Sequence, residues 1–115
     1  MKTTIFKEFN FSAAHNLTID GHPCSKLHGH NYRVIFELFG KQDANGMIID
    51  FTEIKNRIQP IIDKLDHSYL NDIIIHPTTS ENIADWLFKQ ANDQFGCVTK
   101  VTLYETNSCG AIVEK

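Results

Sequence analysis

The chain has 115 residues, a length that suits a single domain, residues 1–115, folded on one hydrophobic core. Its 42% hydrophobic and 22% charged residues exclude a disordered chain, and a net charge of −3 is too weak to indicate binding to nucleic acid or to an anionic membrane. The apolar runs are too short to cross a bilayer, and three unevenly spaced cysteines favour a reducing cytoplasm over a disulfide framework.

The first part of the chain predicts two strands joined by a long loop. Residues 3–14 alternate, with apolar side chains on odd positions, and His15 continues that parity. Residues 16–29 contain glycine and proline turn signals, and residues 30–40 return as a second strand. We expect an antiparallel pair, with a connection long enough to carry a function.

Two helices follow. Asp50 precedes an apolar stripe with helical spacing, which predicts a helix over residues 51–65, although Pro60 removes one of its hydrogen bonds. The segment Thr78-Thr-Ser-Glu81 fits a second capping box, and the helix that it begins is closed by Gly96.

The last part predicts two more strands, over residues 99–105 and 111–113, while Ile73 to Ile75 are expected to be buried. The order β-β-α-α-β-β suggests an α+β fold in which two helices cover one face of an antiparallel four-stranded sheet. The other face would remain uncovered, which indicates an oligomer.

Three histidines converge in this scheme. His28 and His30 share one face of a strand, and His15 ends the neighbouring strand, so the three rings have the composition of a catalytic zinc site with an open position. The alternative is that each is an ordinary, partly buried histidine. His22 and His76 lie in loops beside prolines and are expected on the surface.

Cys24 lies four residues before His28. It is either a fourth zinc ligand, which would close the site, or a free thiol that serves as base or nucleophile beside the metal. A buried inert cysteine is the third alternative, and we assign that role to Cys97 and Cys109.

Two carboxylates complete the candidate chemistry. Asp66 is adjacent to His67 and either orients its ring or caps a helix beside a surface histidine. Glu105 shares the parity of an apolar strand face, so it either pairs with a basic residue such as Arg33 or Arg57 or binds a ligand with two parallel N–H donors.

Together these motifs resemble the 6-pyruvoyltetrahydropterin synthase family over nearly the whole chain. The matching segments are Phe11-Ser-Ala-Ala-His15, Cys24-x-x-x-His28-Gly-His30-Asn-Tyr, Gly46-Met-Ile-Ile-Asp50-Phe, Leu65-Asp-His67, Pro77-Thr-Thr-Ser-Glu81-Asn and Glu105-Thr. Three residues between the cysteine and His-Gly-His look like the bacterial branch that makes 6-carboxytetrahydropterin for queuosine, because biopterin-forming members usually have a longer spacing.

The resemblance implies a tunnelling fold (T-fold), in which trimers close their sheets into a barrel and two trimers stack as a homohexamer. It also implies a role for each of several residues in a catalytic site. Zinc would be bound by His15, His28 and His30, Cys24 would be the base, Asp66 and His67 would relay protons from a neighbouring subunit, and Glu105, with Thr78 and Thr79, would bind the pterin.

The implied reaction converts 7,8-dihydroneopterin triphosphate to 6-carboxy-5,6,7,8-tetrahydropterin and releases acetaldehyde and triphosphate. One alternative is elimination of triphosphate to give 6-pyruvoyltetrahydropterin. A second alternative is a non-catalytic module that binds zinc or a pterin.

Overall fold

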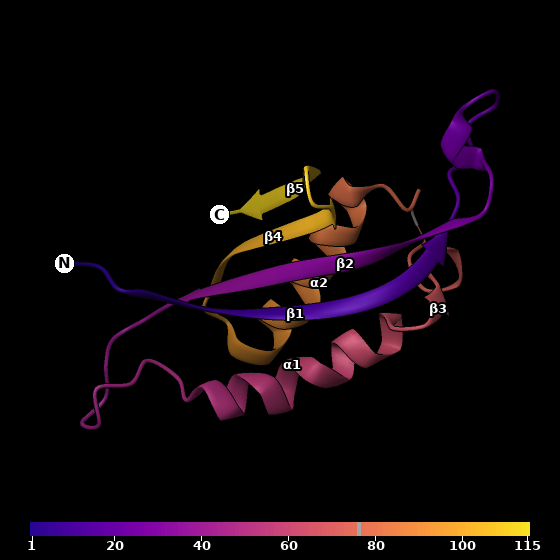
Figure 1. Ribbon diagram of the computed structural model, residues 1–115. Coiled ribbons are helices and arrows are strands. Elements are labelled where there is room, and N and C mark those ends of the chain that lie inside the picture. The colour runs from indigo at the N-terminus through magenta and orange to yellow at the C-terminus, as the bar shows by residue number, and fades with distance from the viewer. Residues whose placement is uncertain (76) are drawn as a thin grey trace.

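The computed structural model describes residues 1–75 and 77–115, which form a five-stranded sheet with two helices on one face (Figure 1). In chain order the elements are β1 (Thr4–His15), β2 (His28–Phe39), α1 (Phe51–Leu65), β3 (Ser68–Tyr69), α2 (Ser80–Phe95), β4 (Val98–Thr106) and β5 (Cys109–Glu114). Short 3-10 turns lie at Pro23–Ser25 and Leu70–Asp72. His76, predicted on the surface, lies outside the described residues.

The sheet has the order β3-β1-β2-β4-β5. Its three longer pairings are antiparallel, but β3 runs parallel to β1, with Ser68 opposite Ala13. The α+β class is confirmed. The predicted four-stranded antiparallel sheet and the order β-β-α-α-β-β are wrong. In the sequence a fifth strand, β3, comes between the two helices, and its parallel pairing with β1 makes the sheet mixed.

Sequence patterns miss β3 because two residues cannot show an alternation. Tertiary hydrogen bonds hold it in place. Ser12 donates its backbone N–H to Asp66 Oδ1 at 2.9 Å, and His67 donates its backbone N–H to the Ser12 carbonyl at 2.6 Å. These bonds draw the chain that leaves α1 against the edge of β1.

The core lies between the sheet and the helices. Phe9 and Phe11 on β1 are at most 5% exposed, which confirms the parity predicted for that strand, and Val34 and Phe36 on β2 are fully buried beside them. The helices cover these strands because each carries an apolar stripe on one side only. The stripe residues are Ile54, Ile58, Ile61, Ile62 and Leu65 on α1 and Ile83, Ala84, Leu87 and Ala91 on α2.

The helix ends follow local chemistry. Asp50 caps α1 by accepting a hydrogen bond from Thr52 N–H at 2.8 Å, and Gly96 ends α2 with a φ of 70°. The cap of α2 is Thr79, one residue later than predicted, because its hydroxyl accepts from Asn82 N–H at 3.3 Å. The predicted burial of residues 73–75 holds for Ile74 but is wrong for Ile75, which is 97% exposed.

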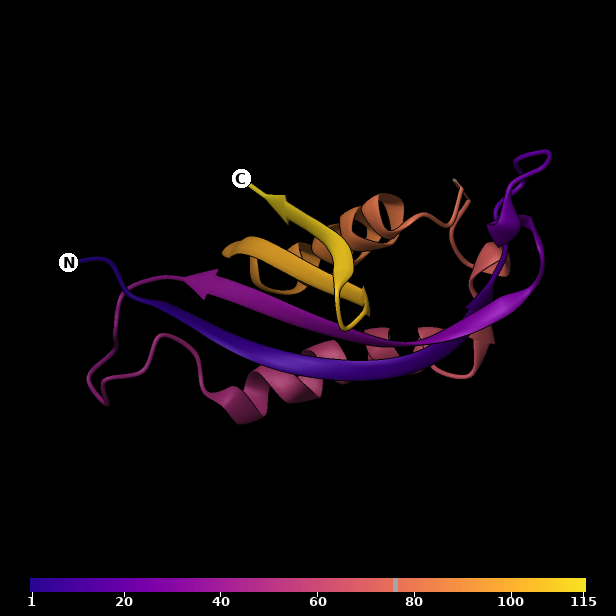
Figure 2. The same cartoon turned by 45° about the horizontal axis from the view of Figure 1, so that its top comes forward.

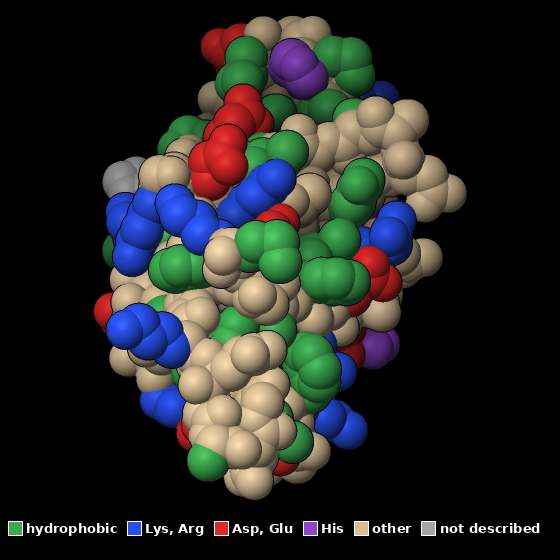
Figure 3. All heavy atoms as spheres, turned by 90° about the vertical axis from the view of Figure 1, so that its left-hand side faces the viewer, with side chains coloured by type: hydrophobic (Ala, Val, Ile, Leu, Met, Phe, Trp, Pro, Cys, Tyr) green, Lys and Arg blue, Asp and Glu red, His purple; other side chains and the backbone are tan. Residues whose placement is uncertain are grey.

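Neither helix covers the other face of the sheet (Figure 2), and this face carries apolar side chains that are exposed to solvent. Phe6 is 67%, Phe39 40% and Ile112 57% exposed. Seen from the end of the molecule that holds the N-terminus, the surface bears basic and acidic side chains together (Figure 3). In the described part of the chain, neither helix is long and apolar enough to span a membrane.

Replacing Ile58 by alanine tests the core. Ile58 is 1% exposed, and its truncation should lower the free energy of unfolding by about 2–5 kcal/mol. The matched control is Ile75→Ala, which should change it by less than about 0.5 kcal/mol because Ile75 is 97% exposed. Guanidinium unfolding at one fixed protein concentration measures both, and equal losses would contradict the assigned core.

Candidate metal centre

The pairing of β1 with β2 gathers three histidines at one end of the sheet, beside the loop that joins these strands (Figure 1). His15 lies directly opposite His28, and His30 lies opposite Ala13. The ring centroids of His15 are 4.6 Å from His28 and 5.3 Å from His30, and one ligand atom from each of the three rings lies within 4.8 Å of the others. The side chains therefore converge on a single point.

Backbone carbonyls fix the tautomers of two rings. His15 Nδ1 lies 2.8 Å from the Thr78 carbonyl oxygen, and His28 Nδ1 lies 2.7 Å from that of Lys26. Because a carbonyl oxygen only accepts hydrogen bonds, Nδ1 carries the proton in both rings. Each Nε2 then keeps its lone pair, which is the form that binds a metal.

Burial also favours the neutral form of the His15 ring. His15 is 2% exposed, and its pKa is lowered chiefly by burial and further by the neighbouring His28 and His30, against the opposing hydrogen bond to Thr78. The Nε2 atoms of His15 and His30 are buried with no hydrogen-bond partner among the described residues. Such atoms are costly unless they bind something. Three imidazole nitrogens around a common point fit zinc, and the choice of zinc stays a prediction.

Glu105 reaches the edge of the cluster from β4. Its Oε1 lies 3.2 Å from His30 Nε2, without the alignment of a hydrogen bond, and its Oε2 accepts from Ser80 Oγ at 2.5 Å. Tyr32 is fully buried beside His30, and its pKa is raised by burial and by the negative charge of Glu105. The carboxylate is thus held between β2, β4 and the start of α2.

Of the two alternatives for Glu105, the pairing with Arg33 or Arg57 is wrong, and the binding of a ligand stays a prediction. Arg33 binds Glu8 at 3.0 Å, and Arg57 binds Glu53 at 3.2 Å. The sequence pattern missed Ser80 as the partner because its hydroxyl reaches Glu105 only through the packing of α2 on β4. The adjacent predicted helix cap is the signal that could have placed Ser80 near the site.

Cys24 lies in the 3-10 turn of the loop between β1 and β2. Its N–H donates to His22 Nδ1 at 3.0 Å, and its carbonyl accepts from Leu17 N–H at 2.8 Å. Within the described residues, the group of mutually close ligand atoms contains the three histidines and not the Cys24 sulfur. His22 is exposed, as predicted, but it also caps the turn, and its position before Pro23 could have indicated that.

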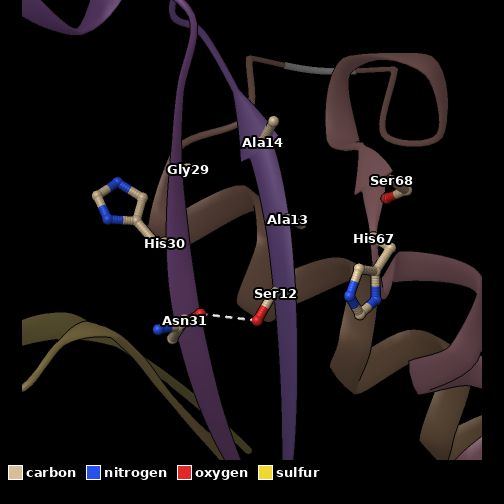
Figure 4. Close-up of a pocket in the computed structure, with 8 residues that line it drawn as sticks. All are labelled: Ser12, Ala13, Ala14, Gly29, His30, Asn31, His67 and Ser68. Atoms are coloured by element: carbon tan, nitrogen blue, oxygen red, sulfur yellow. Dashed lines mark hydrogen bonds between the residues drawn. The ribbon is translucent and has the colours of Figure 1, made fainter.

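Asp66 and His67 form a pair. His67 Nδ1 lies 2.9 Å from Asp66 Oδ2. The pKa of Asp66 is lowered, first by the backbone hydrogen bond from Ser12 and then by His67. The ring of His67 lies on the other side of the β1–β2 pair from that of His30 (Figure 4). Within one chain the pair therefore does not face the three histidines.

The two threonines have local roles. Thr78 is fully buried, and its hydroxyl oxygen lies 3.1 Å from His15 Nδ1, in addition to its carbonyl contact. Thr79 caps α2 through Asn82 N–H. Their predicted contact with a pterin stays a prediction.

Comparison with known proteins points to one family. The family model for 6-pyruvoyl tetrahydropterin synthase matches residues 4–115. A relative from Archaeoglobus fulgidus, named putative 6-carboxy-5,6,7,8-tetrahydropterin synthase, is 38% identical over 92% of this chain and 90% of its own. A relative from Pyrococcus furiosus, named dihydroneopterin monophosphate aldolase, is 32% identical over 99% of both chains.

The fold agrees with these relatives. The solved structure of Caenorhabditis elegans 6-pyruvoyl tetrahydropterin synthase matches with a TM-score of 0.90 and 27% identity, over 100% of this chain and 96% of that chain. The five-stranded sheet with its two helices is therefore similar to that of a pterin synthase.

Replacing His28 by alanine tests the metal centre. The variant should lose bound zinc, because two nitrogen donors remain where three lie close together. The control is His22→Ala, which removes an imidazole from the same loop and should keep about one zinc per chain. Elemental analysis of dialysed protein measures both. Zinc retained by His28→Ala, or lost equally from both variants, would contradict this site.

Proposed function

The chain belongs to the 6-pyruvoyl tetrahydropterin synthase family, and from that premise we propose that it is a zinc-dependent carbon–carbon lyase. It converts 7,8-dihydroneopterin triphosphate and one water to 6-carboxy-5,6,7,8-tetrahydropterin, acetaldehyde and triphosphate, in queuosine biosynthesis. The observation that carries the proposal is the three-histidine cluster with Cys24 four residues before His28. The name of the Archaeoglobus fulgidus relative supports this product over others in the family.

The histidines would hold the zinc, which as a Lewis acid acidifies the hydroxyls of the substrate side chain. His15 is the most constrained of them. Its Nδ1 is bound by Thr78, so its ring has one orientation and presents Nε2. The buried position of His15 also excludes water from that side of the cluster.

Cys24 is the proposed base. Its backbone is bound on both sides, by His22 and Leu17, so the turn holds the thiol in a defined place while the side chain remains half-exposed. A divalent cation held by the histidines would favour the thiolate form of a nearby thiol, and Cys24 would then take a proton from the substrate side chain.

Asp66 and His67 form the proposed proton relay. Asp66 is fixed by Ser12 N–H and holds the His67 ring through Nδ1, which leaves Nε2 of His67 to exchange protons. Because the pair does not face the histidines of its own chain, we propose that it serves the site of a neighbouring subunit.

Glu105 is the proposed pterin anchor. A carboxylate matches the 2-amino group and N3–H of a pterin, which offer two parallel donors. The hydrogen bond from Ser80 holds the Glu105 side chain in place before substrate arrives. Thr78 and Thr79 immediately precede Ser80 in the chain, and we place them along the same pterin edge.

Assembly into a homohexamer of two stacked trimers completes the proposal. The exposed side chains of Phe6, Phe39 and Ile112 on the helix-free face support burial between subunits. The three cysteines are free thiols in the structure, which suits the cytoplasm as the proposed location.

The deciding experiment is incubation of the zinc-loaded protein with dihydroneopterin triphosphate, followed by mass analysis. We expect 6-carboxytetrahydropterin and acetaldehyde. A 6-pyruvoyl product would favour the triphosphate-eliminating alternative. Bound zinc without turnover on this substrate would favour a binding module or, given the name of the Pyrococcus furiosus relative, aldol cleavage of dihydroneopterin monophosphate, which a parallel incubation would detect.

Replacing Cys24 by alanine separates base from ligand. The variant should keep about one zinc per chain, because three histidines suffice, and should lose about 10²–10⁴ in kcat. The control is Cys109→Ala, which removes a free thiol that is exposed, not buried as predicted, and should leave both values unchanged. If Cys24→Ala instead released the metal and kept its activity, Cys24 would be structural.

A further inference from the structure

Asn71 lies in the 3-10 turn after β3 and contacts the residue that follows the first histidine. Its Oδ1 accepts from Asn16 N–H at 3.2 Å, and its Nδ2 donates to the Asn16 carbonyl at 2.9 Å. The amide thus pairs with both polar backbone groups of Asn16, as a neighbouring strand would.

The same amide reaches the histidine cluster through Thr78. Thr78 Oγ1 lies 3.0 Å from Asn71 Oδ1 and 3.1 Å from His15 Nδ1. His15 Nδ1 carries its proton, so the bonds run in one direction: His15 donates to Thr78, and the Thr78 hydroxyl donates to Asn71. Asn71 therefore fixes the Thr78 hydroxyl, which contacts the Nδ1 side of the His15 ring.

Asn16 connects this network to the loop of residues 16–27, which carries Cys24 and which we call the Cys24 loop. The side chain of Asn16 donates from Nδ2 to the Ser25 carbonyl at 3.4 Å and accepts from the Tyr69 hydroxyl. The next residue, Leu17, donates its N–H to the Cys24 carbonyl at 2.8 Å. Anchoring Asn16 therefore anchors the base of this loop.

We propose that Asn71 is a positioning residue that holds the His15 ring and the base of the Cys24 loop as one hydrogen-bonded unit. The part of this proposal that concerns the His15 ring depends on the metal centre alone. The part that concerns the Cys24 loop matters for catalysis only if the proposed function is correct. Asparagine suits the position because it supplies an acceptor and a donor side by side. Aspartate has the same shape but would set an oxygen against the Asn16 carbonyl.

The test compares Asn71→Ala and Asn71→Asp with Asn92→Ala. Asn92 is also half-buried and also holds a backbone group, accepting from Val98 N–H at 3.2 Å at the far end of α2. Both Asn71 variants should bind zinc about tenfold more weakly in chelator competition. This loss of affinity is at the lower end of the range for replacing a residue that hydrogen-bonds to a metal ligand. Asn92→Ala should stay within about twofold of the parent.

A second readout needs no metal. In the apo-protein, hydrogen exchange at the Leu17 amide should be faster in both Asn71 variants and unchanged in Asn92→Ala. Parent-like zinc affinity and Leu17 exchange in the Asn71 variants would overturn the proposal. So would equal zinc losses in Asn71→Ala and Asn92→Ala, which indicate general destabilisation, or a parent-like Asn71→Asp, which indicates space-filling alone. Neither zinc affinity nor Leu17 exchange depends on the product formed. The test of Asn71 can therefore succeed or fail separately from the proposed reaction.

Discussion

The register of β1 against β2 is the constraint on which the rest of this structure depends. It sets His15 opposite His28, and the strand alternation then brings His30 to the same face. A shift of one residue would turn one strand's histidines to the opposite face of the sheet. The register is secured by burial, because Phe9 and Phe11 share the parity of His15, and a slipped strand would expose them. Hydrophobic packing along the middle of the strands thus positions polar chemistry at their end.

The change from core to site occurs within the same two strands. Where the apolar stripes end, the inward side chains become histidines, and the groups that satisfy them come from elsewhere in the chain. The Thr78 carbonyl lies just before α2, and the Lys26 carbonyl lies in the loop before β2. Each accepts the Nδ1 proton of one ring and leaves Nε2 free. Burial disfavours the charged form of His15, so structure and electrostatics both favour a neutral ligand.

Asp66 combines a structural role with a proposed functional role. It is the C-terminal cap of α1, it accepts the Ser12 N–H that draws β3 alongside β1, and it also holds the ring of His67. One carboxylate therefore joins helix, sheet and proposed relay. The direction of His67 away from the histidines of its own chain supports the proposed assembly, in which the pair would serve the cluster of a second subunit.

The sequence by itself determined the elements that depend on local chemistry and on long periodic patterns. The bounds of α1, the parity of the core strands, the glycine that ends α2 and the convergence of three histidines all follow from side-chain period and capping. Only the tertiary structure decided what depends on contacts between distant segments. It revealed β3, the partner of Glu105, the exposure of Ile75 and the Asn71 network, each of which rests on hydrogen bonds or packing that leave no periodic signal. A repeating pattern records which face of a segment is buried, but a single polar contact across the fold is recorded in no pattern at all.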